Sequence, residues 1–302
     1  MDIISTNGLT KKYKNQIVVD NLNLNVKKGE IYGFLGNNGA GKTTTMKMLL
    51  GLTEPTSGSI NLFGEDIKRK NKLLKRVGSL IEYPGFYGNL TAYENLKIFA
   101  DLYGVSKPKK IDELLEIGGL SQYKNKLVRK FSMGMKQRLG IIRTLINDPE
   151  LLILDEPING LDPNGIKEIR EFLVSLSTEK KLTIMISSHI LSEIEQMADK
   201  IGILHKGALC DEINVKEFKN NVNKFIEIKV NNVFEAVRIL EEKLNIYSYE
   251  VRKDEIIIFE RINDSHIINK TLIDKGLKVT KLYVNTLCLE SYFTDITKGR
   301  VC

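Results

Sequence analysis

The strongest chemical pattern in the sequence is a glycine-rich run that ends in a lysine and two threonines. Residues 36–44 read G-N-N-G-A-G-K-T-T and fill the pattern G-x-x-x-x-G-K-[ST]. The glycines allow backbone N–H groups to converge on phosphate oxygens, and a helix that begins there adds partial positive charge. Lys42 is expected to reach the β- and γ-phosphates, and the Thr43 hydroxyl to ligate Mg²⁺. The run therefore predicts a triphosphate site formed by Gly36, Asn37, Asn38, Gly39, Ala40, Gly41, Lys42, Thr43 and Thr44.

Two adjacent carboxylates follow a short apolar run at residues 151–157, which read L-L-I-L-D-E-P. In an open α/β sheet, the carboxyl end of such a strand lies beside the phosphate loop. Asp155 is therefore placed to hold Mg²⁺ through water, and Glu156 to act as general base for the water that attacks a γ-phosphate. Because adjacent side chains of a strand point to opposite faces, both can serve one site only if the strand ends there.

The segments that must position these residues alternate between strand and helix patterns. Residues 17–26 end in a regular alternation of polar and apolar residues, which predicts a half-exposed strand. Residues 30–36 form an apolar run typical of a fully buried strand, and a helix is expected from about 41 to 50. Further strands are expected near 59–63, 77–81, 150–154, 182–187 and 200–204. This alternation predicts an α/β fold in which helices flank a parallel sheet.

Two intervals depart from this alternation. Residues from about 83 to 147 contain helical patterns at 91–103, 109–117 and 134–147, so we expect a helical insert there. From residue 214, the expected elements are a strand at 224–230, a helix at 232–244, strands at 246–251 and 255–260, a helix at 264–275, a strand at 278–284 and a helix at 286–297. This βαββαβ order with an extra helix is the ferredoxin-like α+β arrangement. We therefore expect two domains, at 1–213 and 214–302.

The composition is that of a globular protein, and it does not point strongly to any one class of binding partner. The 302 residues include 45 Lys and Arg against 38 Asp and Glu, a formal net charge of +7, and 42% are apolar. The basic residues are scattered, which indicates a solvated surface or a weak attraction to anionic lipid or phosphorylated ligands. Nucleic acid is not an expected partner, because basic and aromatic residues do not interleave in a patch. We expect neither a signal peptide nor a membrane span, and the three separated cysteines suit a reducing compartment.

A phosphate loop alone is compatible with a GTPase, a kinase or a helicase. The absence of an N-K-x-D guanine-recognition motif argues against a GTPase. Further motifs accompany the loop: F-S-M-G-M-K-Q-R at 131–138, N-G-L-D at 159–162 and S-S-H at 187–189, with Tyr13 lying 23 residues before Gly36. This set, in this order, resembles the nucleotide-binding subunit of ATP-binding cassette (ABC) transporters. The resemblance covers about residues 1–213 and implies a P-loop ABC-type ATPase domain that binds ATP and Mg²⁺.

The resemblance also implies roles for the residues that match the family motifs. It implies that two copies of the chain pack head to tail with two ATP molecules between them. Tyr13 matches the aromatic residue that stacks on adenine, and His189 matches the switch histidine that contacts the γ-phosphate. Ser132 and Gly134 match the signature segment that contacts the γ-phosphate bound to the opposite copy. Asp162 matches the loop that joins the two sites across the dimer.

Glu82 stands where this family usually has a glutamine that ligates Mg²⁺ and senses the membrane partner. A carboxylate suits the same role, because Mg²⁺ is a hard cation that prefers oxygen; a substitution without mechanistic meaning is the alternative. Together with Met133 and Met135 in the signature segment, Glu82 resembles a subgroup of bacterial exporters that confer bacitracin resistance or lantibiotic self-immunity. The L-E-x-x-F pattern at 289–293 resembles the ending of single-cassette exporter subunits.

The resemblance therefore implies a cytoplasmic ATPase subunit, peripheral on the inner face of the cell membrane, that drives a separate integral membrane permease. The helical insert and the loop after Glu82 are expected to receive a cytoplasmic helix of that permease. The cargo is expected to be a peptide antibiotic, and the C-terminal domain to serve regulation or dimer support. Two other classes stay open from the sequence: a cassette ATPase that acts on a cytosolic assembly, and a nucleotide-gated binding protein with little hydrolysis.

Overall fold

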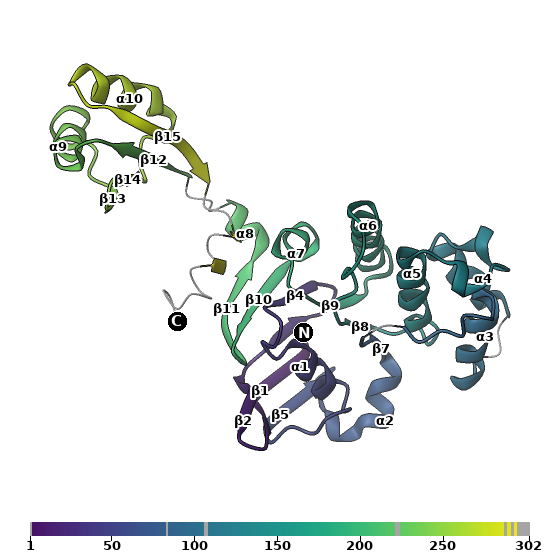
Figure 1. The fold of residues 1–302 in the computed structure, drawn as a ribbon. Helices are drawn as coiled ribbons and strands as arrows, with labels where there is room; N and C mark the ends of the chain where they lie inside the picture. Colours follow the sequence, from purple (N-terminus) through teal and green to yellow (C-terminus); the bar gives the residue numbers. More distant parts are fainter. Residues whose placement is uncertain are drawn as a thin grey trace. The chain divides into compact units, whose positions relative to one another are not determined.

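The computed structural model describes residues 2–82, 84–105, 108–220, 224–286, 289–290 and 293–294. The chain divides into two compact units, Met1–Lys216 and Glu217–Val301, which we call unit 1 and unit 2 and describe separately (Figure 1). This division lies three residues after the domain boundary expected between residues 213 and 214.

Unit 1 is built around a six-stranded sheet with the order β11-β10-β4-β9-β8-β7 (Figure 1). Its strands are β4 (Ile31–Gly36), β7 (Val77–Leu80), β8 (Leu151–Leu154), β9 (Thr183–Ser188), β10 (Lys200–His205) and β11 (Ala208–Asn214). The strands from β10 to β7 are parallel, which confirms the predicted α/β fold. The antiparallel edge strand β11 was missing from the expected elements, because its mostly half-buried residues form no apolar run.

The central strands of this sheet are buried on both faces, which explains their continuous apolar sequences. Every residue of β4, β8 and β9 is buried. One face of β4 lies in a core that it shares with α1 (Lys42–Leu49). On the other face, α7 (Leu191–Met197) packs so close to Gly33 that an added Cβ would lie 2.2 Å from Ile194 Cγ2. A side chain at Gly33 would therefore push α7 away from the sheet.

A second, antiparallel sheet of unit 1 is formed mainly by the N-terminal strands. Its members are β1 (Asp2–Tyr13), β2 (Gln16–Leu22), β3 (Asn25–Lys27), β5 (Ser57–Leu62) and β6 (Glu65–Asp66). The single strand expected at 17–26 is wrong, because β2 and β3 pair with different parts of β1. The buried Thr6 hydroxyl fills the break between them: it donates to Leu22 O and accepts from the Leu24 N–H, both at 2.9 Å.

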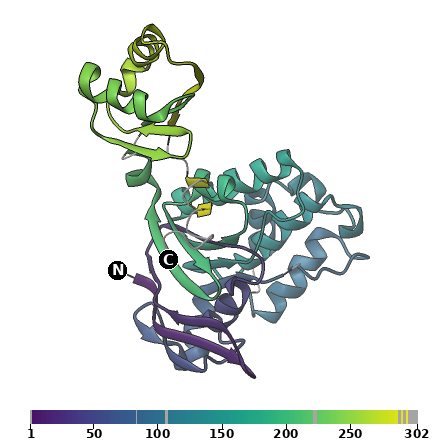
Figure 2. The same ribbon diagram turned by 60° about the vertical axis from the view of Figure 1, so that its left-hand side comes forward.

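The helical insert of unit 1 contains α3 (Ala92–Leu102), α4 (Pro108–Ile117) and α5 (Met133–Thr144). These helices match the three segments expected there, and they pack against one another. Figures 1 and 2 show them gathered at one side of unit 1. The described residues between 84 and 147 include no assigned strand, as expected for a helical insert.

Besides α7, the described part of the chain before residue 221 contains the helices α2 (Lys70–Leu73), α6 (Pro163–Lys180) and α8 (Val215–Asn220). None of the described helices combines the length and the apolar composition that crossing a membrane requires.

Unit 2 has the βαββαβ order expected of a ferredoxin-like domain. Its elements are β12 (Lys224–Val230), α9 (Val233–Leu244), β13 (Tyr249–Arg252), β14 (Glu255–Ile258), α10 (Ser265–Asp274) and β15 (Val279–Thr286). The four strands form an antiparallel sheet with the order β13-β14-β12-β15. Alternate residues of β12 enter a core with α9 and α10, so unit 2 has a core of its own. The helix expected at 286–297 falls mainly outside the described residues.

A buried asparagine ties the loop that follows β7 to the helical insert. Asn95 of α3 is fully buried, and its Oδ1 accepts from the Tyr87 N–H at 2.9 Å. Its Nδ2 donates to Tyr87 O at 3.1 Å and to Thr91 O at 2.9 Å. Because a buried polar group that loses its partner carries the full cost of desolvation, these bonds fix the loop on α3.

We expect Asn95→Ala to lower the free energy of unfolding by about 1–3 kcal/mol, because the Tyr87 backbone groups lose their partners. Asn89→Ala is the matched control, since Asn89 lies in the same loop with an exposed side chain. Urea unfolding followed by circular dichroism measures both variants. Equal stability of the two variants would contradict the role assigned to Asn95.

Candidate functional site

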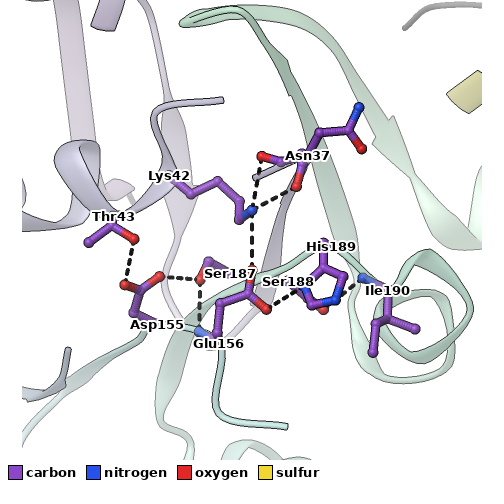
Figure 3. Close-up of polar contacts among 10 residues, drawn as sticks. Asn37, Lys42, Thr43, Asp155, Glu156, Ser187, Ser188, His189 and Ile190 are labelled. Atoms are coloured by element: carbon purple, nitrogen blue, oxygen red, sulfur yellow. Dashed lines mark hydrogen bonds and ion pairs between the residues drawn. The ribbon is translucent and has the colours of Figure 1, made fainter. Parts of the chain in front are cut away.

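Polar residues singled out in the sequence meet at the carboxyl ends of three neighbouring strands. We call this group the strand-end cluster; it consists of Lys42, Thr43, Asp155, Glu156 and His189. β4 leads into the loop before α1, β8 leads into the two carboxylates, and β9 ends next to the histidine. Since the three strands are parallel neighbours, their carboxyl ends reach the same edge of the sheet. Figure 3 shows the lysine and threonine side chains directed towards the two carboxylates.

The loop between β4 and α1 ends in a conformation that glycine alone adopts readily. Gly41 has a φ of 106°, and an added Cβ would lie 2.6 Å from Val18 O. α1 begins at the next residue, so the N–H groups of its first turn have no partner within the helix. An anion such as a phosphate is the ligand that this arrangement favours.

Lys42 is buried, and acceptors surround its ammonium group. Its Nζ donates to Gly36 O at 2.6 Å and to Asn37 O at 3.3 Å, and it lies 3.1 Å from Glu156 Oε1. The last contact is an ion pair without hydrogen-bond geometry, because Oε1 has no hydrogen-bond partner among the described residues. Glu156 Oε2 lies 2.9 Å from His189 Nδ1. The Glu156 carboxylate therefore stands between an ammonium and an imidazole (Figure 3).

Ser187 orients both carboxylate residues. β8 ends at Leu154, as expected if both carboxylates serve one site, and Glu156 has a left-handed φ of 48°, which is uncommon for a residue other than glycine. Ser187 Oγ accepts from the Glu156 N–H at 2.9 Å and donates to Asp155 Oδ1 at 2.5 Å. Because Ser187 is fully buried, water does not compete for these two bonds.

Asp155 and Thr43 place two oxygen ligands beside the phosphate loop. The Thr43 hydroxyl donates to Asp155 Oδ2 at 2.7 Å, and Asp155 is buried. A hydroxyl and a carboxylate are donors that suit Mg²⁺. Across the described ranges, no group of three or more His, Cys, Asp and Glu side chains could hold a metal by itself. The donor set therefore fits a cation that takes its other ligands from phosphate and water.

Glu82 lies on the surface of unit 1 and contacts Lys47. Its side chain is 68% exposed, and its Oε1 lies 2.9 Å from Lys47 Nζ. The hydrogen bond to Glu82 is the largest cause that raises the pKa of Lys47, and the negative charge of Asp155 raises it further. Lys47 follows Thr43 by one helical turn on α1, so Glu82 reaches the helix face that carries the threonine.

Four residues matched to the family motifs lie apart from the strand-end cluster. Tyr13 is 48% exposed at the end of β1. Ser132 and Asp162 are the N-cap residues of α5 and α6, and each side chain accepts from the N–H three residues later at 3.2 Å. Gly134 lies in the first turn of α5. Within the described part of the chain, none of the four is hydrogen-bonded to the strand-end cluster.

The sequence motifs do not identify Ser187 as a residue that orients the carboxylates or Lys47 as the partner of Glu82. Ser187 belongs to the S-S-H motif, in which the histidine carries the resemblance. The sequence feature that could have indicated a role for Ser187 is that it is a polar residue in an apolar strand. The spacing of Lys47 and Thr43 places both on one helix face, but it does not indicate Glu82, 35 residues further along the chain, as the partner.

Comparison with known proteins points to one family. The family model described as ABC transporter matches residues 19–159. The bacitracin transport ATP-binding protein BcrA of Bacillus licheniformis is 52% identical over 299 residues, which cover 98% of this chain and 98% of that protein. The lantibiotic transport ATP-binding protein SrtF of Streptococcus pyogenes is 47% identical over 221 residues, which cover 73% of this chain and 93% of that protein.

A solved structure resembles the chain in fold as well as in sequence. It is the dimeric structure of a post-hydrolysis state of the ATP-binding cassette MJ0796 bound to ADP and Pi. The match has a TM-score of 0.63 and 25% identity, and it covers 70% of this chain and 98% of that one. Sequence, fold and the phosphate loop agree, and the chain therefore belongs to the ABC transporter family as an ATP-binding ATPase.

Proposed function

We propose that the chain is the ATP-hydrolysing subunit of a bacterial exporter of peptide antibiotics and that it powers a separate membrane permease. The strand-end cluster supports hydrolysis, because the Glu156 carboxylate lies 3.1 Å from Lys42 beside a loop that suits phosphate. The relatives support transport: BcrA is named for bacitracin transport and SrtF for lantibiotic transport. Cargo of the bacitracin or lantibiotic type is the corresponding proposal for this chain.

The chain's own residues supply a phosphate clamp, a base and an orienting contact. Lys42 and the N–H groups at the start of α1 would bind the phosphates. Once the Lys42 ammonium binds a γ-phosphate oxygen instead, Glu156 loses its ion pair and can accept a proton from the attacking water. His189, 2.9 Å from that carboxylate, would hold it in place and contact the γ-phosphate. Ser187 would keep Glu156 aligned with Asp155 throughout this exchange.

Three side chains of unit 1 would hold the magnesium ion of the nucleotide. Mg²⁺, when bound, supplies positive charge that polarises the phosphoryl oxygens. The Thr43 hydroxyl would ligate it directly, and Asp155 would hold it through water. Glu82 would add a carboxylate oxygen once it leaves Lys47.

A second copy, packed head to tail, would complete each site with its signature segment. Ser132 and Gly134 stand at the start of α5, where the helix dipole favours an anion. A Cβ added at Gly134 would meet no heavy atom within 4 Å in the described chain, so packing within one copy does not require a glycine there. The close approach of a triphosphate held by the other copy would require it. Asp162 would lie at the same interface, and Tyr13 would stack on adenine.

A groove between the central sheet and the helical insert offers a docking place for the permease. Its volume is about 910 Å³, and its lining includes Leu52, Leu102 and Tyr103. These three side chains are 66%, 75% and 58% exposed, and clustered exposed apolar side chains often mark an interaction site. An amphipathic cytoplasmic helix of the permease would cover them. The chain would then lie on the inner face of the cell membrane.

Replacing the base tests the hydrolytic part of the proposal. Glu156→Gln should lower the ATPase turnover number by about 10²–10⁴, because an amide cannot accept the proton of the attacking water. The variant should still bind ATP and should accumulate as an ATP-bound dimer, as measured by size-exclusion chromatography with radiolabelled nucleotide. Glu179→Gln, at an exposed carboxylate of α6, is the control and should match the parent chain. Turnover of Glu156→Gln at the parent rate would exclude Glu156 as the base.

The orienting role of Ser187 has its own test. Ser187→Ala should lower the turnover number by about 10- to 100-fold, because two hydrogen bonds to the carboxylate residues are lost. Ser187→Thr keeps the hydroxyl and should retain more activity than the alanine variant. Ser188→Ala is the matched control, since Ser188 is equally buried but caps the Ile190 N–H instead. Equal losses in the two alanine variants would show a general packing defect rather than an orienting role.

The groove distinguishes an exporter subunit from a cassette that acts on a cytosolic assembly. Leu102→Glu should leave the ATPase activity of the isolated chain unchanged and reduce recovery of an integral membrane protein with the chain from detergent-solubilised membranes. The reason is that a carboxylate would have to be buried under the docked helix. Phe234→Glu, at a 91% exposed side chain of unit 2, is the control. If the parent chain recovers only soluble proteins, the cytosolic alternative holds.

A further inference from the structure

The partner of Glu82 is a lysine that the catalytic scheme does not use. Lys47 Nζ lies 2.9 Å from Glu82 Oε1, and the two side chains are 35% and 68% exposed. Lys47 lies one turn beyond Thr43 on α1, and the negative charge of Asp155 contributes to raising its pKa. The ion pair therefore lies next to Thr43 and Asp155, the other two proposed magnesium ligands, at the edge of the strand-end cluster.

The backbone of Glu82 is held in an unusual conformation. Its φ is 65°, in the left-handed region that non-glycine residues rarely adopt. Such a conformation persists only where neighbouring contacts determine it. The hydrogen bonds of Asn95 fix the loop at Tyr87 on one side, and β7 fixes the chain as far as Leu80 on the other. Glu82 thus lies between two anchored points of the chain. Among the described ion pairs and hydrogen bonds, Lys47 alone anchors its side chain to α1.

The ion pair between Lys47 and Glu82 adds little stability, and another cation can replace Lys47 in it. A single ion pair between exposed side chains is a weak contact, because water solvates both charges well. A divalent cation at the phosphates would compete for the same carboxylate, since Mg²⁺ prefers anionic oxygen. Bringing that cation to Glu82 while Lys47 is still bound would place two positive charges against one carboxylate. The two partners of Glu82 should therefore oppose each other.

We propose that Lys47 is a positioning residue that competes with the nucleotide-bound divalent cation for the Glu82 carboxylate. This inference rests on the proposed role of Glu82 as a metal ligand. Lys47 holds Glu82 on α1, and arrival of the metal with its nucleotide transfers the carboxylate from the ammonium to the metal. The transfer displaces the start of the loop that Asn95 attaches to the helical insert, so the occupancy of the site is communicated towards α3. A glutamine at this position would form no ion pair with Lys47, so the competition requires the carboxylate.

A double-mutant cycle on the full chain tests this competition through metal affinity rather than through turnover. The variants are Lys47→Met, Glu82→Gln and the combination of both, with Lys47→Arg as the charge-conserving control. Mn²⁺ is the probe, and its dissociation constant is measured by electron paramagnetic resonance with a non-hydrolysable ATP analogue at saturation. Lys47→Met should tighten Mn²⁺ binding by about two- to fivefold, the value of a weak ion pair expressed as a ratio of affinities. Lys47→Arg should leave the affinity close to that of the parent chain.

The outcome in the Glu82→Gln background decides the matter. If Lys47 acts through Glu82, Lys47→Met should change Mn²⁺ affinity by less than about 1.5-fold there, because the pair no longer exists to be broken. Equal tightening in both backgrounds would overturn the proposal, since Lys47 would then act on the metal only through space. Unchanged affinity in Glu82→Ala, which unlike glutamine supplies no oxygen to the metal, would remove Glu82 from the metal site and the competition with it, while leaving the assignment of Glu156 untouched. Circular dichroism confirms folding, and Lys47→Gln replaces Lys47→Met if the latter fails to fold.

Discussion

The parallel pairing of β4, β9 and β8 is the constraint on which the site depends. Three segments that are far apart in the sequence end within hydrogen-bonding distance because their strands run side by side in the same direction. All three strands are buried on both faces, so packing on both sides of the sheet fixes their register. A slip of one residue would reverse the direction of every side chain and separate Ser187 from Asp155. The core thus sets the geometry that the polar residues use.

Within this geometry, the two carboxylates differ in the groups that neutralise them. Glu156 faces two basic side chains, Lys42 and His189, so its charge is balanced within the chain. Asp155 is buried, and among the described residues it forms no ion pair; its carboxylate accepts hydrogen bonds from the hydroxyl groups of Thr43 and Ser187, which carry no charge. A buried carboxylate without a cationic partner is costly, and a metal ion relieves that cost. The same site therefore favours a cation at Asp155 and a phosphate anion near Lys42.

Local patterns were sufficient to predict most strands of the central sheet and the segments that carry the strand-end cluster. Apolar runs located β4, β8 and β9, and the motifs located Lys42, Asp155 and Glu156, because each is a feature of a few consecutive residues. The break between β2 and β3 was not predictable, since it depends on a hydroxyl of β1 that replaces the sheet's own hydrogen bonds. The partners of Ser187 and Glu82 were not predictable either. Both contacts join residues more than 30 positions apart, and spacing in one sequence carries no information about them.

Unit 2 contributes no residue to the proposed site. Every residue assigned to the phosphates, the metal or the dimer contact belongs to unit 1, and unit 2 has a separate hydrophobic core. The match to SrtF covers 93% of that protein but only 73% of this chain, whereas the match to BcrA covers 98% of both. A transport ATP-binding relative thus lacks a counterpart for about a quarter of this chain. ATP hydrolysis is common to the family, whereas unit 2 is not. The function of unit 2 must therefore be one that relatives as long as BcrA have and shorter relatives lack.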